Sequence, residues 1–247
     1  MERLVCLAIG YVFGIFQTAY IYGKMHGIDI RQCGSGNAGA TNTLRVLGKK
    51  AGLIVFLGDV AKTVLAVLAV RLIFGNKYPD MLPLLGMYAA AGTILGHNFP
   101  VQLGFRGGKG IACTAGMVVT LGPIVTLLEA ATFLLIVGIT RFVSLGSIIV
   151  VIELVIDLAV LGQMGYYGMS QPHLYEFYAV CAALSLMAIY RHRANIRRLM
   201  SGTESRIFEK KAEKISYWGG TEDGKCQCDR SRQLGISSCK TSLQKWS

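Results

Sequence analysis

Long apolar runs alternate with short polar segments along this chain, a pattern typical of membrane-spanning helices. About 20 apolar residues allow a helix to cross roughly 30 Å of hydrocarbon. The runs that we expect to form such helices lie at about 4–23, 53–74, 81–95, 145–161 and 174–190. A further apolar stretch, from Ile111 to Thr140, is interrupted by Gly122-Pro123.

Proline breaks a helix unless it lies near the helix start, so we expect two short helices in this stretch, at about 111–121 and 123–139. A single kinked or re-entrant element is the alternative. The pattern therefore predicts an all-α, polytopic integral membrane protein with about seven transmembrane helices, or with five spans and a re-entrant pair. The first run begins at Leu4 and is long for a signal sequence, so we expect it to be a retained helix.

Composition supports a membrane protein and narrows its partners. The chain has 247 residues, of which 53% are hydrophobic, and its mean hydropathy of +0.48 is too high for an ordinary soluble domain. The formal charge of +11 resides mainly in loops and in the last 43 residues, which indicates contact with anionic lipids rather than with nucleic acid. Seven cysteines at irregular spacing do not indicate a disulfide framework.

Lysine and arginine are distributed unevenly over the loops. Three polar segments, 31–52, 96–112 and 190–204, hold most of them together with the turn 141–144, whereas the loops on the other side hold Arg3, Lys77 and, at a helix end, Arg71. Cytoplasmic loops are enriched in these residues. We therefore expect the N-terminus outside, the C-terminus in the cytoplasm, and all three polar segments on the cytoplasmic face.

The chemistry of the polar segments suits an anionic ligand. They combine small residues, which let the backbone approach a ligand, with hydroxyls, amides and cations. We expect the three segments to meet and to bind phosphate. The glycines at 34, 36 and 39 have the spacing of a dinucleotide fingerprint, but no strand precedes them, and Lys109 is followed by Gly110 where a P-loop needs Ser or Thr.

Two of the four histidines lie in these segments beside amides, as His97-Asn98 and as His192 with Asn195. Histidine in such a place can donate to an anion or transfer a proton near neutral pH. An isolated histidine would more often be a satisfied interfacial residue. The carboxylates are too few and scattered to indicate a metal site.

Other charged residues allow less specific conclusions. Asp59 and Lys62 share one face of the second expected helix, and they fit a structural ion pair as well as a part of the site. Glu153 and Asp157 lie inside an apolar run, and the sequence assigns them no role. A basic cluster after a last span usually sets topology and contacts lipid, which we expect for most of Arg191, Arg193, Arg197 and Arg198.

Taken together, the segments resemble the bacterial acyl-phosphate-dependent glycerol-3-phosphate acyltransferases, the PlsY family. The resemblance covers about residues 1–206 and rests on GSGNAGATNTLR at 34–45, GHNFPVQLGFRGGKGIA at 96–112, HRANIRRLMSGTE at 192–204 and GDVAK at 58–62. It implies a compact seven-helix enzyme of the bacterial cytoplasmic membrane with a cytoplasm-facing site and no cofactor or metal. Membrane lipids would surround it, and its oligomeric state stays open.

The resemblance further implies transfer of a fatty acyl group from acyl phosphate to the 1-hydroxyl of sn-glycerol 3-phosphate. The products would be 1-acyl-sn-glycerol 3-phosphate (lysophosphatidic acid) and phosphate, as the first step of bacterial phospholipid synthesis. We expect direct attack by the glycerol hydroxyl without an acyl-enzyme, because acyl phosphate is already activated. The proton would pass to the departing phosphate or to His192, and the sequence leaves both open.

Carried over motif by motif, the catalytic residues would be His192, Ser35, Arg45 and Lys109, which with Asn195 would also bind glycerol 3-phosphate. Acyl phosphate would be held, and the site lined, by Asn37, Thr41, Asn42, His97, Asn98, Gly107, Gly108, Gly110, Ser144 and Glu204.

Two other functions compete with the acyltransferase. A transporter of an anionic solute would use the ionisable residues inside the spans, but the chain shows no internal repeat and its polar residues gather at one face. A non-catalytic lipid-binding protein is the third reading. We expect residues 1–204 to form the membrane domain and residues 205–247 a polar, disordered cytoplasmic tail, in which Cys226, Cys228 and Cys239 are weak evidence for zinc.

Overall fold

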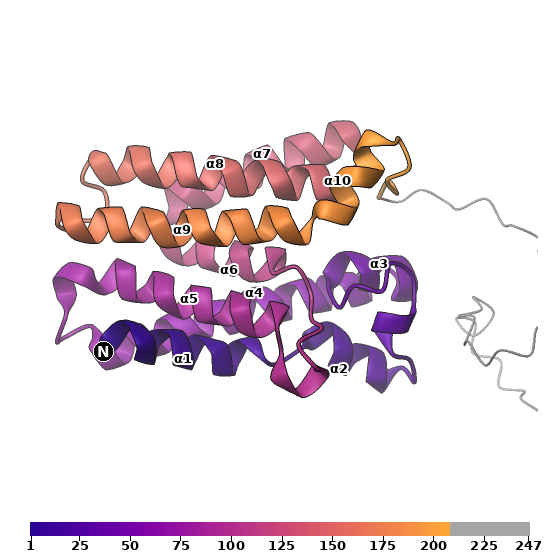
Figure 1. Ribbon diagram of the computed structural model, residues 1–247, viewed down its shortest axis with the longest axis horizontal. Coiled ribbons are helices and arrows are strands. Elements are labelled where there is room, and N and C mark those ends of the chain that lie inside the picture. Colours follow the sequence, from indigo (N-terminus) through magenta and orange to yellow (C-terminus); the bar gives the residue numbers. More distant parts are fainter. Residues whose placement is uncertain (208–247) are drawn as a thin grey trace, which may run out of the picture. The chain divides into compact units, whose positions relative to one another are not determined.

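The structure is a computed structural model that describes residues 1–207, and this part of the chain consists of helices and their connections, without strands (Figure 1). The α-helices are α1 (Glu2–Gly14), α2 (Thr18–Met25), α3 (Ala40–Leu47), α4 (Lys49–Phe74), α5 (Leu82–Asn98), α6 (Ile111–Leu121), α7 (Pro123–Thr140), α8 (Val143–Gln163), α9 (Gln171–Arg191) and α10 (Arg193–Met200). Short 3-10 turns occupy Ile30–Gln32, Pro79–Met81 and Val101–Leu103. The expected all-α membrane fold is confirmed.

The long helices run lengthwise beside one another, and the short helices α2, α3 and α10 lie at the end away from the N-terminus (Figure 1). The connection between α5 and α6 reaches the same end, as does the α7–α8 turn (Figure 1). The three polar segments therefore meet at one end of the helices, as the distribution of lysine and arginine indicated.

Glycines allow α1 and α5 to pack with their backbones nearly in contact. A Cβ atom built on Gly10 would lie 1.9 Å from the carbonyl oxygen of Ala89, and one on Gly92 would lie 2.0 Å from that of Leu7. Gly14 and Gly96 continue both rows four residues later and face each other's backbone. Such small residues at four-residue spacing are a common means of helix association in membranes. They position the C-terminal end of α5, where the second polar segment begins.

The expected first span, 4–23, is not one continuous helix. It is broken at residues 15–17, between α1 and α2. Buried side chains explain the break, because Gln17 Nε2 donates to the carbonyls of Gly14 (3.2 Å) and His97 (3.1 Å), and Lys62 Nζ donates to that of Phe16 (2.8 Å). In apolar surroundings, backbone carbonyls that lose their helical partners need other donors, and these side chains provide them.

The interruption at Gly122-Pro123 separates α6 from α7, as the proline predicted. In the described residues, the helices long and apolar enough to cross a membrane are α1–α2 taken together, α4, α7, α8 and α9. With 17 and 11 residues, α5 and α6 are about 26 and 16 Å long, which is less than a full hydrocarbon core. The number of complete spans and the orientation therefore stay predictions.

Candidate functional site

The first polar segment is folded around one buried amide. Asn42 on α3 accepts a hydrogen bond from Ser35 N (2.8 Å) and donates to the carbonyls of Ile30 (3.1 Å) and Cys33 (3.0 Å). Gly34 and Gly36 supply the left-handed conformations that this turn requires. The amide of Asn42 is thus occupied in shaping the loop, and Ser35 lies exposed on its surface. We had expected Asn42 to line the site, whereas the structure gives it a supporting place; Asn37 and Thr41 are half-buried nearby.

The second polar segment returns across the end of α5. Gly107 N and Gly108 N donate to the carbonyls of Asn98 and His97, both at 3.2 Å. The guanidinium of Arg191 donates to the carbonyls of Gly107 and Gly108. The glycine backbone is thereby held on both sides, and α6 begins directly after it.

The two residues at the end of α5, which we expect to line the site, are deeply buried. His97 is 3% exposed and Asn98 is fully buried. Asn98 Oδ1 has no hydrogen-bond partner among the described residues, and a Cβ atom built on Gly110 would lie 3.0 Å from it. Gly110 has a φ of 82°, so this position favours glycine for its conformation as well as for space. Both residues support the glycine segment, because their backbone carbonyls accept from Gly107 N and Gly108 N.

Glu204 ties the third segment to two other parts of the chain. Its carboxylate accepts hydrogen bonds from Ser144 Oγ (2.8 Å), Asn195 Nδ2 (2.7 Å) and Arg198 Nε (2.7 Å). Although burial opposes ionisation, these bonds lower the pKa of Glu204 below its usual value. The carboxylate is therefore charged at neutral pH and fixes Asn195 in orientation.

Lys109 and Arg45 are two of the cations that the first two segments contribute to this end. Lys109 Nζ donates to Asn195 Oδ1, and the guanidinium of Arg45 donates to the carbonyl of Ser205 (3.1 Å). Arg45 Nε is buried and has no hydrogen-bond partner in the described part of the chain. Burial lowers the pKa of Lys109 to about 8, with Arg198 and Arg45 acting in the same direction against Glu204. The positive charge of this cluster is thus only partly neutralised by Glu204, so the cluster suits an anion.

His192 lies at the junction of α9 and α10, and 3% of it is exposed. Its Nδ1 lies 2.8 Å from the carbonyl of Ala188. A carbonyl only accepts, so Nδ1 carries the hydrogen and Nε2 has the lone pair in the neutral ring. Burial, followed by the charge of Lys109, lowers the pKa of His192 to about 4, so the ring is neutral at pH 7.

The structure shows contacts of the third segment that the sequence did not indicate. We expected most of its arginines to contact lipid, but Arg191 holds the glycine segment and Arg198 pairs with Glu204. We also expected a tail from residue 205, but Ser205 accepts from Arg45, and Ile207 N donates to the carbonyl of Arg141 at 2.8 Å. The tail cysteines and the zinc hypothesis lie outside the described residues.

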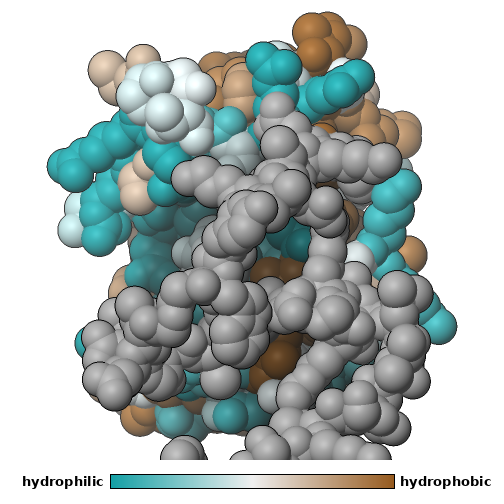
Figure 2. Space-filling model, turned by 90° about the vertical axis from the view of Figure 1, so that its right-hand side faces the viewer, coloured by the Kyte–Doolittle hydropathy of each residue, from teal (hydrophilic) through white to brown (hydrophobic). Residues whose placement is uncertain are grey.

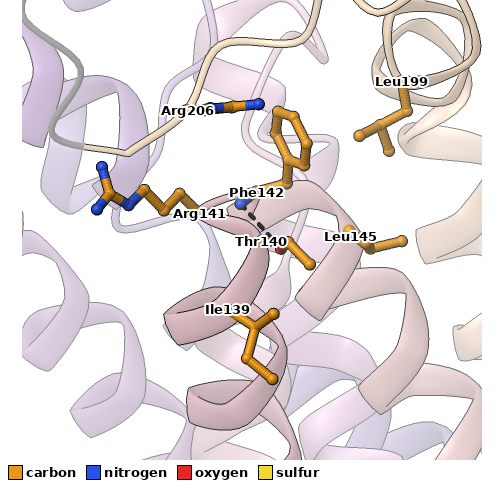
Figure 3. A pocket seen from close by; sticks show the side chains of 7 residues that line it. All are labelled: Ile139, Thr140, Arg141, Phe142, Leu145, Leu199 and Arg206. Carbon is orange, nitrogen blue, oxygen red and sulfur yellow. Dashed lines mark hydrogen bonds between the residues drawn. The ribbon is translucent and has the colours of Figure 1, made fainter.

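A cavity of about 550 Å³ lies at the α7–α8 turn (Figure 3). It is lined by Ile139, Thr140, Arg141, Phe142, Leu145, Leu199 and Arg206. In the sequence, its lining residue Leu145 directly follows Ser144, and Arg206 lies two residues after Glu204. The guanidinium of Arg206 lies 5.5 Å from the centre of the Phe142 ring. Apolar side chains at the ends of α7 and α8 thus adjoin the polar end, where hydrophilic residues gather (Figure 2).

Comparison with known proteins places these features in a family. The family model described as glycerol-3-phosphate acyltransferase matches residues 4–202. Proteins named glycerol-3-phosphate acyltransferase are similar over most of their length: one from Clostridioides difficile (strain 630) is 41% identical, covering 84% of this chain and 97% of the relative, and one from Crocosphaera subtropica is 40% identical, covering 83% and 93%.

Solved structures agree with the sequence relatives. The glycerol 3-phosphate form of PlsY (YgiH), an integral membrane glycerol 3-phosphate acyltransferase, has a TM-score of 0.72 at 34% identity and covers 83% of this chain and 96% of that protein. The lysophosphatidic acid form of PlsY gives a TM-score of 0.70 at 33% identity, with 83% and 95% covered.

Proposed function

The chain belongs to the glycerol-3-phosphate acyltransferase family, and from this premise we propose that it transfers a fatty acyl group from acyl phosphate to the 1-hydroxyl of sn-glycerol 3-phosphate. The observation that carries the proposal is the convergence of Arg45, Lys109 and His192 from three separate segments on one polar end. The relatives' names support the acceptor and the reaction. The acyl phosphate donor rests on the resemblance and on the charge of the site.

Electrostatics favours two phosphate-bearing substrates. Like unit charges about 4 Å apart near a protein surface repel by about 4 kcal/mol, so two phosphates require several nearby cations. Lys109, Arg45 and Arg198 interact electrostatically with one another and with Glu204. A phosphate bound here would offset the burial and the repulsion from Arg198 and Arg45 that lower the pKa of Lys109. Ser35, exposed on the adjoining loop, supplies a hydroxyl to glycerol 3-phosphate.

The reaction needs no protein nucleophile. The 1-hydroxyl oxygen attacks the acyl carbonyl carbon, and the bond from that carbon to the phosphate oxygen breaks. Phosphate leaves with the bonding electron pair, and the hydroxyl proton must go to a base. Because acyl phosphate is activated, positioning and charge stabilisation supply most of the catalysis.

We assign the proton to the departing phosphate and a positioning hydrogen bond to His192. With a pKa of about 4, His192 is a weak base, whereas a phosphate group has a second pKa of about 6. The lone pair on Nε2 can still accept the hydroxyl hydrogen bond and orient the attacking oxygen. Substitution by Gln, which retains an acceptor, should therefore preserve more activity than substitution by Ala.

We place the site on the cytoplasmic side of a bacterial plasma membrane. The bias of lysine and arginine towards the polar end supports this orientation. The acyl chain would approach between apolar helices, and the cavity beside Phe142 joins apolar side chains to the polar end.

Phosphate release by the purified, detergent-solubilised protein tests the proposal. Palmitoyl phosphate should release phosphate only when glycerol 3-phosphate is present, with an equal amount of lysophosphatidic acid. Acyl-coenzyme A and acyl carrier protein donors, run in parallel, should give no product. Turnover with either of these instead of palmitoyl phosphate would overturn the donor assignment, and no turnover with any donor from folded protein would overturn the function.

A further inference from the structure

A buried ammonium group lies where the first span is broken. Lys62 Nζ on α4 contacts Asp59 Oδ1 at 2.8 Å, the carbonyl of Phe16 at 2.8 Å and His97 Nδ1 at 2.9 Å, with the carbonyl of Gly14 farther away at 3.5 Å. Asp59 is fully buried and Lys62 is 7% exposed. An ion pair at this depth is costly unless its hydrogen bonds are satisfied. The proposed reaction assigns no part to either residue.

A second contact of the Asp59 carboxylate connects α2 to the same cluster. Thr18 Oγ1, at the start of α2, donates to Asp59 Oδ1 at 2.9 Å. A Cβ atom built on Gly58 would lie 2.7 Å from Thr18 Cγ2, so a glycine at this position lets α2 approach α4. Within the GDVAK stretch at 58–62, Gly58 thus allows α2 to approach α4, Asp59 provides the carboxylate, and Lys62 provides the ammonium of one cluster.

The ammonium fixes the protonation of the His97 ring. A charged lysine has three N–H donors and no acceptor, and here three acceptors lie within 2.9 Å of Nζ. His97 Nδ1 must therefore contribute a lone pair, which places the ring hydrogen of the neutral imidazole on Nε2. This tautomer is the opposite of the one that the Ala188 carbonyl imposes on His192.

The far edge of the His97 ring faces the junction of the first two polar segments. A Cβ atom built on Gly108 would lie 2.1 Å from His97 Nε2 and 2.7 Å from the carbonyl oxygen of Ala38. Nε2 and that carbonyl therefore crowd the same side of Gly108. Because both atoms lie near the same Cβ position, we expect an N–H at Nε2 to suit the carbonyl oxygen better than a lone pair would.

We infer that Lys62, held by Asp59 and by the carbonyl of the broken span, is a positioning residue that keeps His97 in its Nε2–H tautomer and so holds the glycine segment 107–110 in shape for the phosphate of the acyl donor. The inference rests on the proposed function for its substrate. It makes the break at residues 15–17 part of the site's support, because the freed carbonyl of Phe16 helps to retain the ammonium.

The cluster also contains atoms that could ligate a metal, since Asp59, His97 and Cys113 offer ligand atoms within 4.8 Å of one another. The ammonium group of Lys62 already supplies the positive charge that a metal ion would supply there. Asp59 Oδ1 and His97 Nδ1 both contact Nζ. A positioning lysine is therefore the better account of this group than a metal centre.

Kinetics of Lys62→Met, with Lys77→Met as the matched control, tests the inference. Lys77 is exposed and belongs to the turn between α4 and α5. In Lys62→Met, His97 Nδ1 is free to donate to Asp59 Oδ1, 3.6 Å away, which leaves a lone pair on Nε2. We expect the KM for acyl phosphate to rise about tenfold or more, the KM for glycerol 3-phosphate to change less than twofold, and Lys77→Met to match the wild type.

Chemical rescue separates a positioning role from general damage. Lys62→Ala should regain acyl phosphate affinity when methylammonium is added, because a small amine can occupy the vacated space and donate to the same acceptors. Tetramethylammonium, which has no N–H donor, should not rescue it. Equal effects of the two cations, or equal losses of affinity for both substrates, would contradict the inference.

A spectroscopic test needs no change at Lys62. In wild-type protein labelled with ¹⁵N-histidine and held in nanodiscs, the His97 signals should show hydrogen on Nε2 and those of His192 hydrogen on Nδ1. The signals that disappear in His26→Gln, His173→Gln and His192→Gln identify these three residues, and the signals present in all three variants belong to His97. A hydrogen on Nδ1 of His97 would overturn the inference whether or not the protein shows turnover, while wild-type protein without turnover would overturn only the proposed function.

Discussion

The protonation of Lys109 should limit activity at alkaline pH. Burial lowers its pKa from 10.5 to about 8, so the ammonium form predominates below pH 8 and is lost as the pH rises through that value. A group with a pKa of about 8 is about nine-tenths protonated at pH 7 and about one-tenth protonated at pH 9. If the charged form alone binds phosphate productively, kcat/KM falls about tenfold across this interval.

The two kinetic parameters should respond differently. The profile of kcat/KM reports the free enzyme, whereas that of kcat reports the enzyme with substrate bound. A bound phosphate stabilises the ammonium and raises the pKa of Lys109. We therefore expect the alkaline limb of kcat to lie at a higher pH than the limb of kcat/KM for glycerol 3-phosphate.

Lys109→Arg isolates the responsible group. Arginine keeps the charge throughout this range, since its pKa exceeds 12, so the variant should lose the limb near pH 8 even if its activity is lower overall. Initial rates of lysophosphatidic acid formation between pH 6.5 and 9.5 measure both enzymes, with donor hydrolysis subtracted and with Lys77→Arg as the control. An unchanged limb in Lys109→Arg would refute the assignment.

Three further predictions concern the residues that support the site and the fold. Glu204→Gln loses the ion pair with Arg198, so kcat/KM measured by phosphate release should fall roughly tenfold or more; wild-type kinetics would contradict the role of the carboxylate. Asn42→Ala removes three hydrogen bonds and should lower the melting temperature in detergent by several degrees, and an unchanged value would deny its supporting place. Gly92→Ala should destabilise the α1–α5 contact, whereas Gly138→Ala, which meets open space, should be neutral or stabilising in the same thermal assay; the reverse order would exclude close packing.

The sequence was sufficient for features that one segment determines by its own composition. Gly122-Pro123 predicted the boundary of α6 and α7, because proline is excluded from a helix interior wherever it occurs. The bias of lysine and arginine predicted that the polar segments share one end, because topology depends on summed loop charge. The convergence of Lys109 with Asn195 follows from that arrangement.

Features that depend on contacts between distant segments could not be read from the chain. The break at residues 15–17 contains one polar residue, Gln17, in otherwise apolar sequence. It depends on the contacts of Gln17 with His97 and of Lys62 with Phe16, which join residues far apart in the chain. The role of Arg191 was equally hidden, because its side chain is chemically the same as those of the surface arginines beside it. Its proximity to Gly107 depends on how α9 packs.

The two buried histidines show how the fold turns one residue type into two different groups. Backbone geometry at a helix end gives His192 a carbonyl partner, so its outward nitrogen accepts, while an ammonium gives His97 a donor partner, so its outward nitrogen donates. Under the proposed function, one ring would accept a hydrogen bond from the glycerol hydroxyl and the other would present a donor beside the glycine segment. The tautomer of each ring is set by the group that contacts its Nδ1, the Lys62 ammonium for His97 and the Ala188 carbonyl for His192. The Lys62 ammonium is buried beside the non-helical backbone at residues 15–17. In apolar surroundings the buried charge needs the freed carbonyl, and the freed carbonyl needs a donor.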